Sequence, residues 1–116
     1  MIYIFSAFYA EAKNIIDHYG LKKEKSPEMV RFDVFANESI RLVITGEINA
    51  AAAVSNIGGA YGISPDDEIL NMGCGAGFSS DICLGSIFLG NKLTEQMTGR
   101  TFYPDMLMKA NFRECE

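Results

Sequence analysis

The sequence predicts an α/β protein built on a mixed, twisted sheet flanked by helices. Apolar stretches typical of buried strands occur at residues 1–8 and 69–72, and the segments between them carry helical spacing and one hairpin pattern. Such an alternation of strand and helix patterns is typical of α/β folds. The chain has 116 residues, of which 48% are hydrophobic, and we expect a single domain over residues 1–116.

The first strand and helix are predicted at the start of the sequence. Residues 1–8 combine apolar aromatic and β-branched side chains, which is typical of a strand buried on both faces of a parallel sheet. Residues 9–19 follow with apolar side chains at helical spacing, and Gly20 ends the predicted helix. The charged residues 21–27 are predicted to form a loop.

A β-hairpin and a second helix are predicted next. Residues 29–36 show the period-two alternation of a strand, Asn37 and Glu38 supply a turn, and residues 40–44 resume as a strand. Residues 48–61 contain four consecutive alanines. Because alanine is the best helix former, we predict a helix there.

The alanines and the glycines of this second helix are interpreted as residues that allow close packing on the sheet. The alanines at 50–53 have small side chains that allow close packing on a sheet, so we expect them in the core. Gly58 and Gly59 weaken a helix. We expect them where the helix approaches the sheet closely.

The candidate ligand site is the end of the predicted buried strand at residues 69–72. This strand runs into a turn that contains Gly73, Gly75 and Gly77. Glycine is used where the backbone takes a positive φ or comes very close to a neighbour. Since ligands bind beyond the carboxyl ends of strands in open α/β sheets, the turn predicts a ligand site. The alternative is a tight turn that binds nothing.

The last part of the chain carries weaker signals. Residues 85–90 are apolar between two glycines and predict another short strand, whereas no regular pattern follows Pro104. Phe102, Tyr103 and Phe112 would form an exposed apolar patch if nothing packs on them. Such a patch indicates contact with a partner.

Charge and hydropathy exclude several classes of partner. The net charge is −5, and Lys22, Lys23 and Lys25 alternate with Glu24 in what we interpret as a solvated loop. Without a concentrated basic surface, a nucleic-acid partner is not expected. No apolar run is long enough to span a bilayer, and the N-terminal segment lacks the features of a signal peptide. We therefore expect a soluble, cytoplasmic protein with no membrane partner.

The cysteines and the histidine predict no metal site. Cys74, Cys83 and Cys115 are scattered, odd in number and without a CxxC pair, which favours a reducing compartment over a disulfide framework. We expect Cys74 and Cys83 to be buried small hydrophobic residues. His18 has no partner at a metal-ligand spacing. Neither a metal nor a cofactor is expected.

Three motifs in sequence order resemble a known family. They are Ser6-Ala-Phe-Tyr-Ala-Glu11, Thr45-Gly-Glu-Ile-Asn-Ala-Ala-Ala52 and Asn71-Met-Gly-Cys-Gly-Ala-Gly77, the last followed by Leu84-Gly-Ser-Ile87. Their order and spacing resemble the N-terminal half of the purine nucleoside phosphorylase and methylthioadenosine/adenosylhomocysteine nucleosidase superfamily. The resemblance implies a nucleoside phosphorylase-like fold, apparently truncated, with residues 1–116 corresponding to about the first half of the family's domain.

The resemblance also implies roles for matching positions. Glu11 falls where nucleosidases place the glutamate that activates the attacking water, which suits a carboxylate that accepts a proton. Without the resemblance, Glu11 is more simply a first-turn acid facing the helix dipole. Cys74 takes a Ser/Thr position beside the ribose and base, where a thiol is a weaker hydrogen-bond partner. The implied substrate-binding residues are Phe8, Gly46, Glu47, Cys74, Gly75, Ala76 and Gly77.

The implied reaction is cleavage of the N-glycosidic bond of a purine nucleoside. Phosphorylases of this family carry an arginine near the first strand, whereas residues 6–11 contain none, so hydrolysis is favoured over phosphorolysis. Arg100 is the candidate anion contact. The family's Met-Glu-x-Glu segment, which grips the ribose, and its aspartate, which protonates the purine, have no match in this sequence.

The resemblance therefore implies a protein that is incomplete or inactive without a C-terminal half. Its expected partners are a purine nucleoside and either further copies of itself or a complementary C-terminal fragment. Two alternatives remain open at this point. In the first alternative, the chain is a module that binds purine nucleosides without cleaving them. In the second, it is a non-catalytic protein that self-associates through an open sheet edge.

Overall fold

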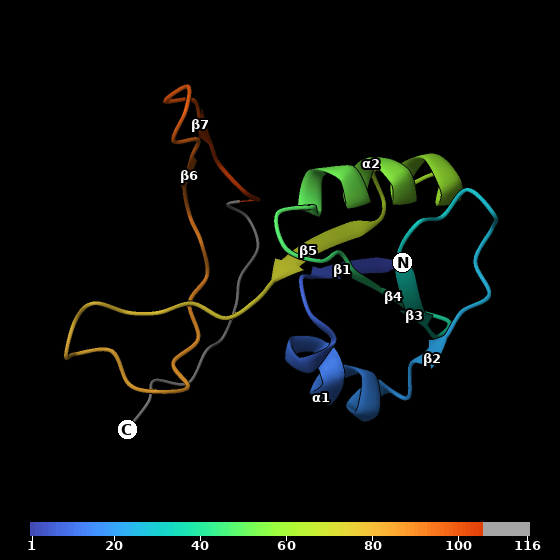
Figure 1. Ribbon diagram of the computed structural model, residues 1–116, viewed down its shortest axis with the longest axis horizontal. Coiled ribbons are helices and arrows are strands. Elements are labelled where there is room, and N and C mark those ends of the chain that lie inside the picture. The colour runs from blue at the N-terminus through green and yellow to red at the C-terminus, as the bar shows by residue number, and fades with distance from the viewer. Residues whose placement is uncertain (106–116) are drawn as a thin grey trace. The chain divides into compact units, whose positions relative to one another are not determined.

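The computed structural model describes residues 1–105 (Figure 1). The chain divides into two compact units, the first over Met1–Gly75 and the second from Ala76 onward. The first unit is an α/β structure with a five-stranded mixed sheet and two helices, so the predicted α/β class with a mixed sheet is confirmed. The nucleoside phosphorylase-like fold that the resemblance implies stays a prediction. The expected single domain over residues 1–116 stays a prediction. Phe112 and Cys115 lie outside the described residues.

The sheet of the first unit has the strand order β2-β3-β4-β1-β5. Its strands are β1 (Ile2–Ser6), β2 (Lys22–Lys23), β3 (Asp33–Ala36), β4 (Ile40–Ile44) and β5 (Glu68–Met72). The central strand β1 pairs in parallel with β4 on one side and β5 on the other, while β2 and β3 are antiparallel additions beyond β4. The carboxyl ends of β1, β4 and β5 therefore lie at the same end of the sheet.

One helix covers each face of the sheet (Figure 1). On one face, Tyr3 and Phe5 of β1 pack in a buried cluster with Ile57 of α2 (Ala50–Tyr61). On the opposite face, Ile4 packs in a second buried cluster with Ile16 of α1 (Tyr9–Tyr19). This alternation along β1 confirms the prediction that the first strand is buried on both faces.

The helix boundaries follow local signals. Helix α1 spans the predicted residues, and Gly20 ends it in the left-handed conformation with φ of 61°. Helix α2 begins at Ala50, two residues later than predicted, because Asn49 is its N-cap and Ile48 has a positive φ of 60°. Gly62 ends α2 with φ of 68°.

The packing interpretations for α2 are largely wrong. Of the four alanines, only Ala53 is buried. A Cβ atom added to Gly59 would meet nothing within 4 Å, and one added to Gly58 would meet only Ile63 Cδ1 at 4.0 Å. Close approach of the helix to the sheet therefore does not explain these glycines.

Three strand predictions need correction. The predicted loop at 21–27 contains β2, which pairs with β3 at the sheet edge. The predicted strand at 29–36 is in a strand only from Asp33, because residues 27–30 close a turn with the Val30 N–H donating to the Pro27 carbonyl. Strand β5 is not buried on both faces, since it is the last strand of the sheet and Ile69 is 52% exposed.

The second unit contains one short hairpin among its described residues. Strands β6 (Leu93–Thr94) and β7 (Thr101–Phe102) pair antiparallel, and the turn between them is closed by the Glu95 N–H donating to the Arg100 carbonyl at 2.8 Å. The predicted strand at 85–90 is wrong, because these residues form no strand and pair with no strand within residues 1–105. Phe102 and Tyr103 are more than half exposed.

Candidate functional site

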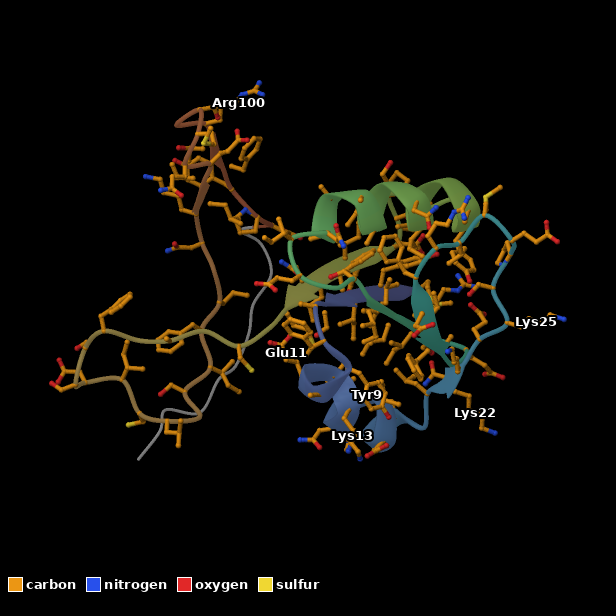
Figure 2. All side chains as sticks on the ribbon, in the orientation of Figure 1. Tyr9, Glu11, Lys13, Lys22, Lys25 and Arg100 are labelled. Atoms are coloured by element: carbon orange, nitrogen blue, oxygen red, sulfur yellow. The ribbon has the colours of Figure 1, made fainter. Side chains whose placement is uncertain are left out.

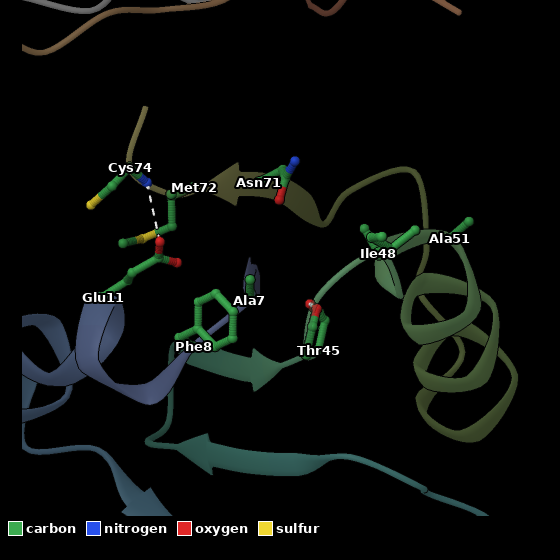
Figure 3. Close-up of a pocket in the computed structure, with 12 residues that line it drawn as sticks. Ala7, Phe8, Glu11, Thr45, Ile48, Ala51, Asn71, Met72 and Cys74 are labelled. Carbon is green, nitrogen blue, oxygen red and sulfur yellow. Dashed lines mark hydrogen bonds between the residues drawn. The ribbon is translucent and has the colours of Figure 1, made fainter. Parts of the chain in front are cut away.

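A hollow of about 510 Å³ lies at the carboxyl ends of β1, β4 and β5 (Figure 3). From β1 the chain continues into α1 on one face of the sheet, and from β4 it continues toward α2 on the other face. In open α/β sheets, ligands bind where the connections of neighbouring parallel strands diverge in this way. The lining residues are Ala7, Phe8, Glu11, Thr45, Gly46, Ile48, Ala50, Ala51, Asn71, Met72, Gly73 and Cys74.

Glu11 is the charged residue of this lining. Its Oε1 accepts a hydrogen bond from the backbone N–H of Cys74 at 3.4 Å (Figure 3). Its Oε2 accepts one from the Ser6 hydroxyl, also at 3.4 Å. Although Glu11 lies in the first turn of α1, no side chain caps that helix. The carboxylate thus bridges the ends of β1 and β5 instead of capping its own helix.

The turn after β5 brings backbone close to Glu11. A Cβ atom on Gly73 would lie 3.7 Å from Glu11 Oε2, which is ordinary van der Waals contact. Gly73, Gly75 and Gly77 have no positive φ, so the first of the two reasons expected for glycine at this turn does not apply. A side chain at position 73 would therefore meet Glu11 without a clash, and close approach does not explain this glycine.

The loop after β4 forms the opposite wall. The β1–β4 ladder continues past the strands, with the Thr45 N–H donating to the Ser6 carbonyl at 2.8 Å and the Gly46 N–H donating to the Ala7 carbonyl at 2.9 Å. Ile48, at the rim, is 96% exposed and has a φ of 60°. A positive φ is strained for a β-branched residue, and such strain concentrates at functional sites.

Four of the sequence-predicted site residues come together around the hollow, namely Phe8, Glu11, Gly46 and Cys74. Glu47 lies between two lining residues, but its side chain is exposed and does not line the hollow. Gly75 ends the first unit and does not line it either.

The remaining predicted residues, Ala76, Gly77 and Arg100, belong to the second unit. A Cβ atom on Gly77 would lie 2.8 Å from Ile82 Cδ1, so packing inside that unit accounts for the glycine. Arg100 is exposed at the end of the β6–β7 turn (Figure 2).

Sequence reasoning missed seven lining residues as site candidates, while Gly73 was expected there as part of the glycine-rich turn. The seven are Ala7, Thr45, Ile48, Ala50, Ala51, Asn71 and Met72. Asn71 was detectable, because a polar amide near the end of an otherwise apolar strand faces a ligand or solvent more readily than a core. Ala50 and Ala51 had been assigned to the core, yet they are exposed at the start of α2 and line the hollow.

The cysteines and the lysines show no further reactive cluster. Cys74 and Cys83 are free thiols and both are exposed, so the prediction that they are buried is wrong. Cys74 lies just after the end of β5, and Cys83 lies just after a turn in the second unit. Neither side chain belongs to the hydrophobic core. Lys13 lies on α1, Lys22 on β2 and Lys25 in the loop after β2, and all three project outward (Figure 2). Within residues 1–105, no three His, Cys, Asp or Glu side chains gather as metal ligands.

The fold and the hollow define a class: an α/β protein with a carboxylate-bearing hollow at the switch point of its sheet. No helix within residues 1–105 has the length and apolarity needed to cross a membrane. Comparisons of the chain with models of protein families, with curated proteins and with solved structures gave no match.

Proposed function

We propose that this chain acts on purine nucleosides and belongs to the nucleoside phosphorylase and methylthioadenosine/adenosylhomocysteine nucleosidase superfamily that its motifs resemble. The single observation that supports this most is the shared hollow of Glu11 and the backbone of Gly73 and Cys74. The three motifs of the resemblance stand on the loops that follow β1, β4 and β5, and each contributes lining residues. Motifs that are separate in sequence thus serve one site.

The proposed reaction is hydrolysis of the N-glycosidic bond. Glu11 orients a water molecule and accepts its proton as the water oxygen bonds to the anomeric carbon of the ribose. The carbon–nitrogen bond breaks at the same centre, and its electron pair leaves with the purine. Of the described residues that line the hollow, Glu11 alone is charged. Without a lysine or arginine among them to hold phosphate, water is the favoured nucleophile.

The departing purine needs a proton, and the described lining offers no second acid. One positioned general acid is worth about 10²–10⁴ in rate. We therefore expect slow turnover by this chain alone, and faster turnover when the ribose-binding and acidic segments are supplied by a C-terminal half. Such a complementary chain, or a further copy of this one, is the proposed protein partner.

The test is an assay of methylthioadenosine, adenosylhomocysteine and inosine hydrolysis. The chain is measured alone and together with the separately produced C-terminal half of a nucleosidase of this superfamily, which is also measured by itself. Release of free purine only in the mixture supports the proposal. Rapid turnover by the isolated chain contradicts the requirement for an external acid, and no turnover in any mixture contradicts the catalytic assignment.

The second candidate is a module that binds nucleosides without cleaving them. It is favoured by the same lack of a second acid, since a hollow with one carboxylate and backbone N–H groups suits binding more than cleavage. Isothermal calorimetry with adenine and adenosine separates the two. Heat of binding without release of purine supports the module, whereas no heat at millimolar ligand excludes it.

A further inference from the structure

Strand β5 leaves one edge of the sheet open. Within the described residues it pairs only with β1. The Glu68 N–H donates to the Met1 carbonyl at 3.0 Å, so Glu68 and every second residue after it direct their backbone groups toward β1. The N–H and C=O groups of Ile69 and Asn71 therefore face the open edge, where another strand can pair with them.

An apolar groove runs beside this edge on the α2 face of the sheet. It measures about 480 Å³ and is lined by Phe5, Ala50, Ala51, Val54, Ser55, Ile69 and Asn71. Ile69 is 52% exposed there. On the other face, Leu70 and Met72 are only partly buried against the α1 side of the core. A strand added at β5 would therefore meet apolar side chains on both faces.

The same chain contains a segment with the properties of such a strand. Residues 82–91 carry no charge. Ile87, Phe88 and Leu89 are 68%, 69% and 46% exposed and belong to no strand. The Ser86 N–H donates to the Cys83 carbonyl at 3.1 Å in a turn that precedes these three residues. An uncharged run that contains β-branched and aromatic residues outside any strand is a strong candidate for strand addition.

We propose that residues 85–90 of a second copy of this chain add to β5 as a further strand. Successive side chains of a strand point to opposite faces, so Ile87 and Leu89 enter the groove while Phe88 covers Leu70 and Met72. A reciprocal exchange covers the edge of both copies and closes the assembly as a two-fold dimer. The groove shares Ala50, Ala51 and Asn71 with the lining of the hollow, but the pairing proposed here does not depend on the proposed nucleoside chemistry.

The second copy is favoured over an unrelated protein because one chain carries both parts of the interface. The structure leaves the β5 edge unpaired and residues 85–90 outside any strand. A single type of contact therefore accounts for two exposed apolar features. Neither side of it brings a charged side chain to its centre, so the net charge of −5 on each copy does not oppose the pairing there.

Sedimentation velocity of the full chain over a range of concentrations tests the proposal. We expect a monomer–dimer equilibrium for the unchanged chain. Ile69→Lys and Ile87→Lys each place a charge in the apolar interface and should raise the dissociation constant of the dimer about 100-fold or more. Met97→Lys is the matched control, because Met97 is 92% exposed and lies outside residues 85–90, and it should dimerise like the unchanged chain. Far-ultraviolet circular dichroism checks that each variant is folded.

A mixing experiment distinguishes a second copy from pairing within one chain. When the Ile69→Lys and Ile87→Lys chains are combined, the mixed dimer has one interface with two unchanged sides, so dimers should reappear. Hydrogen exchange at the Ile69 and Asn71 amides should slow as concentration rises. A monomer at every concentration overturns the proposal. Protection of the Ile69 and Asn71 amides in the monomer also overturns it. So does a Met97→Lys chain whose dimer is weakened as much as those of the Ile69→Lys and Ile87→Lys chains.

Discussion

Glu11 and Cys74 are 63 positions apart in the sequence, and the backbone N–H of Cys74 donates a hydrogen bond to Glu11 Oε1 at 3.4 Å. The bond joins the first turn of α1 to the turn after β5, across the carboxyl end of β1. A half-buried carboxylate is thereby held at the switch point of the sheet, where a ligand would meet it. At 3.4 Å the bond is longer than an ordinary N–H···O hydrogen bond.

Replacing Glu11 by glutamine tests its proposed role as the base. The substitution keeps the shape of the side chain and removes the charge that accepts a proton. In the mixture with a C-terminal half, we expect purine release to fall about 10²–10⁴-fold. Glu38→Gln is the control, because Glu38 is exposed in the turn between β3 and β4 and does not line the hollow. Equal rates for the two variants would remove Glu11 from the chemistry.

Replacing Ile48 by glycine should stabilise the protein. The residue has a φ of 60° and is 96% exposed, so the change relieves backbone strain and loses almost no buried surface. The strain of about 1–2 kcal/mol exceeds the entropy cost of glycine, and we expect a net gain of about 0.5–1 kcal/mol. Urea denaturation measures it. Ile48→Ala retains a Cβ atom and should show no such gain. A gain of the same size for Ile48→Ala would show that relief of backbone strain is not the cause of the stabilisation.

Removing the Tyr61 hydroxyl should destabilise the first unit. This hydroxyl donates to Glu24 Oε2 at 2.6 Å, and the Arg41 guanidinium lies 4.2 Å from the ring centre. Tyr61→Phe keeps the ring and loses the hydrogen bond, so we expect a loss of about 1 kcal/mol in the free energy of unfolding. Tyr19→Phe, at a side chain that is 53% exposed, should lose less. Urea unfolding at pH 7 compares the two variants.

The Tyr61 contribution should also depend on pH. Burial raises the pKa of the Tyr61 hydroxyl above its ordinary 10.0, and the hydrogen bond to Glu24 acts in the same direction. The folded state therefore favours the protonated hydroxyl. Its stabilising effect is fully present below pH 10 and is lost as the pH rises through the higher folded value. A difference between Tyr61→Phe and the unchanged chain that grew above pH 10 would contradict this.

Asp67 should contribute stability that acid removes. The Ser64 N–H donates to Asp67 Oδ2 at 2.9 Å, and this hydrogen bond lowers the pKa of the carboxyl below its ordinary 3.8. The Met1 ammonium also lowers this pKa, whereas desolvation raises it by less than these effects lower it. A lowered folded pKa gives stability that is present above pH 3.8 and lost as the pH falls through the folded value.

Asp67→Asn should therefore lower the urea midpoint at pH 7, and the difference from the unchanged chain should vanish in strong acid. Its exposed neighbour provides the control variant, Asp66→Asn. Urea titrations between pH 2 and 7 follow both variants. A difference that persisted undiminished at pH 2 would show that the charge of Asp67 is not what matters.

The elements with local signals could be predicted well. Helix α1 ends at Gly20 as expected, because a helix stop depends on a residue that adopts the left-handed conformation. The turn at Asn37 was likewise predictable, since its side-chain Oδ1 accepts hydrogen bonds from the Ser39 and Ile40 N–H groups at 2.8 Å. Strand β2 was missed because two lysines become a strand only when β3 pairs with them.

The candidate site could be predicted in part. The motifs pointed to Glu11 and Cys74, and the fold brings these two together. Thr45, Ala51 and Asn71 were missed, because membership of the hollow depends on which strand ends meet. The roles of Glu47, Gly75, Ala76, Gly77 and Arg100 stay predictions of the resemblance.

The sequence by itself determined where the helices run, which residues alternate across β1, and that a carboxylate and a glycine-rich turn follow two apolar strands. These features depend on neighbours a few residues apart, through backbone preferences and side-chain period. Only the tertiary structure decided that β5 ends the sheet, that residues 85–90 lack a strand partner, and that Ala50 and Ala51 face a hollow. Each of these depends on pairing between distant segments, which local patterns do not specify.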